Sequence, residues 1–377
     1  MDKMGKLTSV PSKVSASEKF QSFIDSLVLH RILKSVFEQT IHLILNSQPG
    51  SIITICGPSG VGKTKLKTHL EKEILRISEL KMEEEPGHIP LVSLDAIAPE
   101  SGNFNWKDFF KRVLMFMQEP LIKQKRKSTM SREAVSELNA LGLRKNAAGA
   151  ELRLALESCF KNRCPKVFII DEAQHILITH STRQLSNQLN TLKSIADCTG
   201  VTQVLIGTYD LRVLSNMSAQ LNRRMVEVHF PNYKYQVEED VEGFINVLHT
   251  FQKIIPLNKV PDLAENYEYF YEKTAGCVGI LKDWLSLAVA HSLNDGKRSL
   301  SMDLIAKYEI SSSRRFQIVQ EIKERERMLD ENHDNEIRSM LGMDEEIVEC
   351  AAPVKVPPKK RRGRVGQRKP TRDPVGM

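Results

Sequence analysis

One stretch of the chain restricts its fold more than any other. Residues 51–65 read SIITICGPSGVGKTK, a short apolar run followed by the spacing G-x-x-x-x-G-K-T. Between an expected strand and an expected helix, this spacing is typical of a phosphate-binding loop. Glycines allow the backbone N–H groups of such a loop to turn toward phosphate oxygens. The expected nucleotide-binding residues are Gly57, Pro58, Ser59, Gly60, Val61, Gly62, Lys63 and Thr64.

Two of these side chains have specific expected roles. Lys63 can reach the β- and γ-phosphates of a nucleotide, and the hydroxyl of Thr64 can bind Mg²⁺. The helix that follows the loop adds the positive end of its dipole to the anion site. An ordinary glycine-rich turn can match the same spacing, but the strand and helix on either side favour a nucleotide site.

A pair of carboxylates forms the second candidate element. Residues 167–172 read VFIIDE, an apolar strand that ends in Asp171 and Glu172. In a doubly wound sheet, such a strand delivers its last side chains beside the phosphate loop. Asp171 would then hold Mg²⁺, and Glu172 would polarise the water that attacks the γ-phosphate. The alternative is a strand that simply ends in solvated acids.

Two weaker candidates lie further along the chain. Thr208 follows the apolar run 201–206, and its hydroxyl could orient the attacking water from the other side. Arg223 and Arg224 could reach the γ-phosphate of a neighbouring subunit from the edge of the domain. The alternatives are a common Gly-Thr turn and a surface charge pair, respectively.

The order of elements predicts an α/β fold. Four apolar strands, at 52–55, 89–94, 166–170 and 201–206, alternate with helical stretches, which indicates a parallel sheet with helices on both faces. From Tyr233 to about Glu309 the pattern is helical throughout, which predicts a small α-helical lid. We therefore expect an N-terminal helical extension (1–45), a nucleotide-binding α/β domain (46–231), a helical lid (232–310), and a charged helix with a basic tail (311–377).

Charge and cysteine content restrict the setting of the protein. The net charge is +7, but residues 354–377 hold nine Lys/Arg and one acid, so the rest of the chain is nearly neutral. No run approaches 18 apolar residues, which predicts that the chain does not span a membrane. The six cysteines show no paired metal-ligand spacing, as expected for reduced thiols in the cytoplasm.

Four segments together resemble the AAA+ ATPases. GPSGVGKT, VFIIDEAQHI, VLIGTYDL and LNRRMVEVHFP occur in the family's order and spacing, and the resemblance covers roughly residues 30–300. More narrowly, they resemble the transposition regulators TnsC, TniB and MuB. The resemblance implies that the chain binds ATP and Mg²⁺, that Thr208 acts as a sensor, and that Arg223 or Arg224 acts across subunits. One departure concerns the lid, because Ile280 stands where many relatives have a sensing arginine and the nearest cation is Lys282.

The resemblance also implies partners. ATP-bound subunits of the family form a ring or helical filament around double-stranded DNA, and they recruit a transposase and a TniQ-like target-selection protein; hydrolysis disassembles them. The family's DNA-facing segments correspond here to the stretch 105–112 and the basic connector 123–132, which favour phosphate contacts over base contacts. The expected DNA-binding residues are Lys107, Lys111, Arg112, Lys123, Lys125, Arg126, Lys127 and Thr129.

Other functions share the same motifs. An origin-recognition or helicase-loading ATPase is one alternative, and an ExeA-like secretion ATPase is another. The basic tail also has alternative interpretations, namely a nuclear-import signal, a DNA- or acid-binding segment, or a disordered solubilising tail.

Overall fold

The computed structural model describes residues 16–100, 102–119, 144–179, 181–214, 224–330 and 338–341 of the 377-residue chain. The chain divides into two compact units, Met1–Glu326 and Arg327–Met377. Within the described ranges, no helix is long and apolar enough to cross a membrane.

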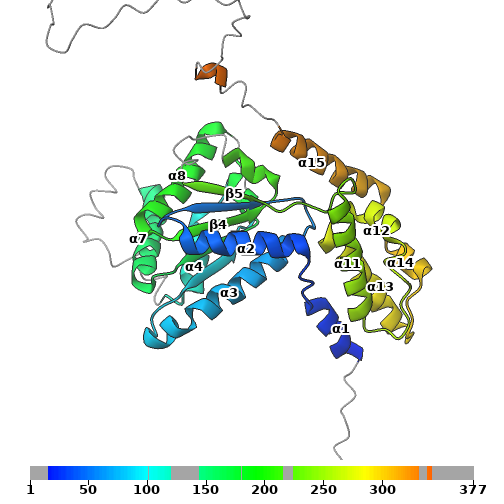
Figure 1. The fold of residues 1–377 in the computed structure, drawn as a ribbon. Coiled ribbons are helices and arrows are strands. Elements are labelled where there is room, and N and C mark those ends of the chain that lie inside the picture. Colours follow the sequence, from blue (N-terminus) through cyan, green and yellow to red (C-terminus); the bar gives the residue numbers. More distant parts are fainter. Residues whose placement is uncertain are drawn as a thin grey trace, which may run out of the picture. The chain divides into compact units, whose positions relative to one another are not determined.

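A five-stranded parallel sheet forms the centre of the first unit (Figure 1). Its order is β2-β3-β4-β1-β5. The strands are β1 (Ile52–Cys56), β2 (Leu91–Asp95), β3 (Val167–Asp171), β4 (Thr202–Gly207) and β5 (Met225–His229). The parallel sheet expected from the apolar strands is therefore confirmed.

The fifth strand was not expected from the sequence. β5 reads MVEVH, with polar Glu227 and His229, and only Val228 is buried. It pairs with β1 at the edge of the sheet, with Cys56 opposite His229. An edge strand needs no continuous apolar run, so the apolar pattern of buried strands does not mark it.

Helices cover both faces of the sheet, because neighbouring strand residues point to opposite sides. In β3, Val167 and Ile169 pack into one core cluster, and Phe168 and Ile170 into the other. The first cluster lies under α2 (Arg31–Asn46) and α3 (Lys63–Glu84). The second lies under α4 (Trp106–Phe116), α7 (Arg144–Arg163) and α8 (Thr182–Thr199). This arrangement is the AAA+ P-loop NTPase fold.

The remaining elements are helical. They are α1 (Ala16–Asp25), α11 (Glu238–Ile254), α12 (Tyr267–Thr274), α13 (Val278–Asn294), α14 (Met302–Lys307) and α15 (Ser312–Asp330), with short 3-10 turns η1 (Ala173–Leu177) and η2 (Tyr209–Arg212). The helical stretch expected after Tyr233 is present, with one β-bridge between Lys259 and Ser299. Ile318 and Ile322 of α15 pack against Cys277 and Ile280 at the start of α13.

The sheet brings the candidate motifs to one edge. The phosphate loop follows β1, the acid pair ends β3, and Thr208 follows β4, all at the carboxyl ends of parallel strands. β4 lies between β1 and β3, with Cys56 opposite Gly207 and Ile170 opposite Leu205. The acid pair is thus two strand spacings from the phosphate loop, about 10 Å along the edge.

Candidate nucleotide site

The loop between β1 and α3 has the backbone that a phosphate cradle requires. Gly60 and Gly62 have φ angles of 77° and 118°, in the left-handed region that favours glycine. α3 begins at Lys63 with no side-chain cap on its N-terminus. The N–H groups of a helix's first turn lack partners within the helix, so this end is suited to an anion.

Lys63 lies inside the loop. Its side chain is buried, and its Nζ donates to the carbonyl oxygens of Gly57 and Pro58, each at 2.9 Å. Burial lowers the pKa of Lys63, while the charges of Glu172 and Asp171 act in the opposite direction. The ammonium group is therefore already in the field of the acid pair.

Asp171 is the buried member of that pair, with 3% of its surface exposed. Burial raises the pKa of its carboxyl group, and the charges of Glu172 and Asp95 act in the same direction. Its Oδ1 accepts the backbone N–H of Glu172 at 2.9 Å. Burial deprives this carboxylate of water, and a bound cation would stabilise its negative charge in place of that water.

Lys67 is a site residue that the sequence analysis missed. Its Nζ lies 3.7 Å from Oδ2 of Asp171 and also pairs with Asp95 at the end of β2. Burial opposes the charge on Lys67, but the hydrogen bond to Asp95 and the charge of Asp171 outweigh it, so its pKa is raised. The sequence spacing could have indicated Lys67, because it lies one helical turn after Lys63 and therefore on the same side of α3.

Glu172 has an unusual backbone conformation. Its φ and ψ angles are 51° and 34°, a left-handed conformation that is rare for a residue with a side chain. Such conformations cluster at functional sites, where the surrounding structure holds them in place. The turn η1 begins at the next residue, and the side-chain amide of Gln174 donates to Oε2 of Glu172.

Thr208 lies where the sequence predicted, directly after β4. Its hydroxyl donates to Asp210 at 3.1 Å, and its backbone N–H donates to Oε1 of Gln174 at 3.2 Å. Thr208 is therefore connected to Glu172 by two hydrogen bonds of Gln174, one from the backbone N–H of Thr208 and one to the carboxylate of Glu172. A role of the Thr208 hydroxyl in orienting water stays a prediction.

The two candidate arginines are not part of this cluster. Arg224 precedes β5, at the amino end of the strands and so at the edge of the sheet opposite the phosphate loop. It is about half exposed and pairs with Asp197. At this location Arg224 does not reach the candidate nucleotide site of its own chain, and a role in a neighbouring subunit stays a prediction. Arg223 lies outside the described residues.

The lid contacts the phosphate loop directly. The N–H of Ile280, in the first turn of α13, donates to the carbonyl oxygen of Gly60 at 3.1 Å. A Cβ atom on Gly60 would lie 2.4 Å from Cγ1 of Ile280, so only glycine fits this contact. Lys282 does not stand in for the missing arginine here, because its Nζ donates to the carbonyl oxygens of Ile24 and Ser26.

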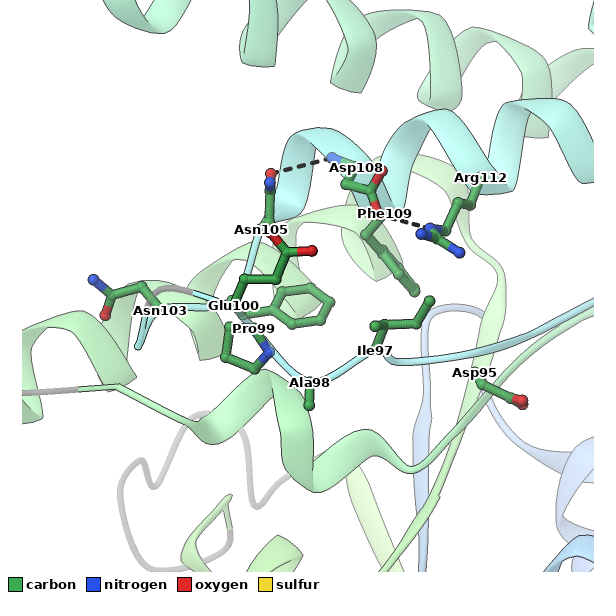
Figure 2. Close-up of a pocket in the computed structure, with 11 residues that line it drawn as sticks. Asp95, Ile97, Ala98, Pro99, Glu100, Asn103, Asn105, Asp108, Phe109 and Arg112 are labelled. Carbon is green, nitrogen blue, oxygen red and sulfur yellow. Dashed lines mark hydrogen bonds and ion pairs between the residues drawn. The ribbon is translucent and has the colours of Figure 1, made fainter.

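The expected DNA-binding residues divide into two groups. Lys107, Lys111 and Arg112 lie on the exposed side of α4, and Lys123, Lys125, Arg126, Lys127 and Thr129 lie outside the described residues. Arg112 lines a pocket of about 260 Å³ after β2, together with Asp95, Glu100 and Asp108. Figure 2 shows how these side chains lie. Arg112 pairs with Asp108 at 2.6 Å, so its charge is partly neutralised.

The side chains at the sheet edge fit Mg²⁺ bound together with a nucleotide. Among the described residues, no group of three His, Cys, Asp or Glu side chains could hold a metal ion alone. Mg²⁺ is commonly held by one or two protein oxygens, with phosphate oxygens and water as its other ligands. Asp171 at the end of β3 and Thr64 in the first turn of α3 match that requirement.

Together, the glycine-rich loop, the buried lysine and the acid pair at one edge of a parallel sheet have the arrangement of a P-loop NTPase site. Residues 46–214 match the family model described as an AAA domain, so this part of the chain is similar to the AAA+ ATPases. No match was found among curated proteins.

Solved structures similar to this chain include an ORC2 protein, a Walker-type ATPase and one domain of a DnaA protein. The ORC2 protein of Aeropyrum pernix is 15% identical, with a TM-score of 0.50 over 77% of this chain and 72% of that chain. A Walker-type ATPase of Pyrococcus abyssi is 15% identical, with a TM-score of 0.43 over 82% and 75%. Domain III of the Thermotoga maritima replication initiation protein DnaA is 12% identical, with a TM-score of 0.41 over 78% and 96%. At 15% identity, the likeness to the ORC2 protein concerns the fold alone.

Proposed function

We propose that this chain hydrolyses ATP to ADP and phosphate and uses the reaction as a switch. The observation that carries the proposal is the convergence of Lys63, Asp171 and Glu172 on one edge of the sheet, next to the start of α3. Each residue type matches one requirement of phosphoryl transfer, namely charge on the phosphates, a metal ligand and a group that activates water.

Each residue has a distinct role in this scheme. The N–H groups of the loop and the ammonium group of Lys63 bind the phosphates and hold them in line for attack. Thr64 and Asp171 hold Mg²⁺, which neutralises charge on the phosphate oxygens when bound. Glu172 orients the attacking water and accepts its proton.

The finer proposal concerns what the switch controls. The motif order resembles that of the TnsC, TniB and MuB transposition regulators, and the connector 123–132 is strongly basic. We infer that ATP-bound subunits assemble on double-stranded DNA with little sequence preference, and that the assembly recruits a transposase and a target-selecting protein. Hydrolysis then ends the assembly. In this scheme Arg223 or Arg224 completes the site of the next subunit.

The ATPase proposal is tested with two variants of the purified chain. Lys63→Ala removes the ammonium group that binds the phosphates, and we expect ATP binding to weaken by about 3 kcal/mol, as for other broken charge pairs. Glu172→Gln keeps the shape of the side chain but cannot accept a proton, so kcat should fall by about 100-fold or more while ATP still binds. Unchanged ATP affinity in Lys63→Ala, or unchanged turnover in Glu172→Gln, would contradict the assigned roles.

The DNA proposal is tested by separating the two basic regions. Neutralising Lys123, Lys125, Arg126 and Lys127 should flatten the salt dependence of ATP-dependent DNA binding, by about 0.9 in slope for each DNA phosphate that is no longer neutralised. Truncation after Ala352 is the control, and we expect it to reduce only ATP-independent binding. If the truncation instead removes the ATP-dependent component, the connector is not the DNA site.

The partner proposal requires its own assay. Stimulation of a transposase by the wild-type chain with ATP, and prolonged stimulation by Glu172→Gln, would support the transposition branch. DNA assembly that loads a replicative helicase and leaves transposase activity unchanged would support the replication alternative instead.

A further inference from the structure

The side chain of Gln174 links the carboxyl ends of β3 and β4, at the edge of the sheet that holds the candidate site. Its Nε2 donates to Oε2 of Glu172 after β3, and its Oε1 accepts the backbone N–H of Thr208 after β4 at 3.2 Å. Both hydrogen bonds are partly buried. One amide therefore joins the candidate water-activating carboxylate to the neighbouring strand of the sheet.

The chemistry of the two partners determines how this amide is oriented. A backbone N–H only donates, and an ionised carboxylate only accepts. The carbonyl end of Gln174 must therefore face Thr208, and the NH₂ end must face Glu172. A carboxylate or a hydrocarbon of the same length cannot satisfy both partners at once.

The backbone around Gln174 leaves room for this arrangement. A Cβ atom on Gly207, the last residue of β4, would lie 2.3 Å from Oε1 of Gln174. Any side chain at position 207 would therefore push the amide away from Thr208. The same atom would lie 3.0 Å from Cδ1 of Leu211, so the space at Gly207 is limited on both sides.

Glu172 gains most from the hydrogen bond to Gln174. The backbone of Glu172 is left-handed, with a φ of 51°, so its side chain starts from a strained turn. A free carboxylate at this position would sample several rotamers. A hydrogen bond from a side chain that is itself tied to β4 restricts this sampling. Groups that activate water need this kind of positioning, because displacement by about 1 Å can cost about 100-fold in rate.

We propose that Gln174 is a positioning residue for the hydrolytic step, which holds the carboxylate of Glu172 in place and couples it to the end of β4. The inference rests on the proposed ATPase function. It assigns to Gln174 no contact with the nucleotide, so ATP affinity is expected to depend little on this side chain.

The test compares four variants with the wild-type chain. Gln174→Ala removes both hydrogen bonds, and Gln174→Glu keeps the length but removes the donor to Glu172. Gly207→Ala displaces the amide while leaving Gln174 and Glu172 intact. Gln252→Ala is the matched control, because Oε1 of Gln252 also accepts a backbone N–H, that of Leu263 at 3.2 Å, within the lid.

We expect kcat to fall about 10- to 100-fold in Gln174→Ala, Gln174→Glu and Gly207→Ala, with the Kd for ATP changed less than about twofold. Gln252→Ala should keep its kcat. In a Glu172→Gln background, Gln174→Ala should lower kcat no further, because the two residues act as one unit. A purely structural role would instead lower kcat in that background too.

Three results would overturn the inference. They are a kcat of Gln174→Ala within about twofold of wild type, an equal decrease in Gln252→Ala, or additive decreases with Glu172→Gln. Absence of ATP hydrolysis by the wild-type chain would overturn the proposed function and this inference with it. Active wild type with an unaffected Gln174→Ala would overturn only the inference.

Discussion

The stability of this chain should depend on pH through one buried histidine. His30 precedes α2, and its Nδ1 accepts the N–H of Leu33 at 3.4 Å and lies 3.1 Å from the hydroxyl oxygen of Tyr233. Burial lowers the pKa of His30 from 6.5 to about 4. The native state therefore keeps this imidazole neutral at pH values where the unfolded chain takes up a proton.

The sign and size of the effect follow from that difference. Above pH 6.5 both states hold neutral histidine, so the stabilisation is complete. Between pH 6.5 and about 4 only the unfolded state binds the proton, so the free energy of unfolding falls as the pH falls. At about 1.4 kcal/mol per pKa unit, the decrease is about 1.4 kcal/mol at about pH 5.5 and about 3 kcal/mol when complete.

The assay is urea unfolding at a series of pH values for the wild-type chain and His30→Asn. Asparagine is also a good N-cap residue but does not titrate, so the variant separates the proton from the cap. We expect the free energy of unfolding to fall by about 1.4 kcal/mol more in the wild-type chain than in the variant between about pH 7.5 and 5.5. Equal decreases in the two proteins would refute the assignment of this pH dependence to His30.

Three further variants test the surroundings of the site. Because the charge of Lys67 lowers the pKa of Asp171, Lys67→Met should raise that pKa and move the acidic limb of the ATPase pH profile to higher pH; an unmoved limb would contradict this. In Gly279→Ala, the new Cβ would lie 2.4 Å from the carbonyl oxygen of Gly60, so nucleotide affinity should weaken, whereas Gly87→Ala, with nothing nearer than 3.7 Å, should bind normally. Ile322→Ala should lower the free energy of unfolding by about 2–3 kcal/mol and speed thiol labelling of buried Cys277. Labelling of Cys277 as slow as in the wild-type chain would show that α15 does not shield it.

The sequence predicted those parts of the site that depend on local patterns. The phosphate loop and the strand ending in Asp171 and Glu172 are contiguous in sequence, and each lies where its pattern placed it. The contributions of Lys67 and Gln174 depend on which strands lie side by side. That order is set by the packing of helices on two faces, and no single segment contains it.

Two differences between the expectations and the structure show what local sequence patterns do not predict. β5 is a five-residue edge strand with polar Glu227 and His229, so it lacks the continuous apolar run that marks β3. Arg112 belongs to a basic stretch in sequence, but one helical turn before it lies Asp108, and the two pair. A count of charges along the chain cannot show which of them are already neutralised.

The position of β4 between β1 and β3 explains why the site needs a connection such as Gln174. The phosphate loop and the acid pair lie two strand spacings apart, about 10 Å, which leaves space for a terminal phosphate and a water molecule between them. The same separation prevents the loop from holding Glu172 directly. β4 is the one strand that borders both, and its end is where Gly207 leaves room for the amide that reaches Glu172.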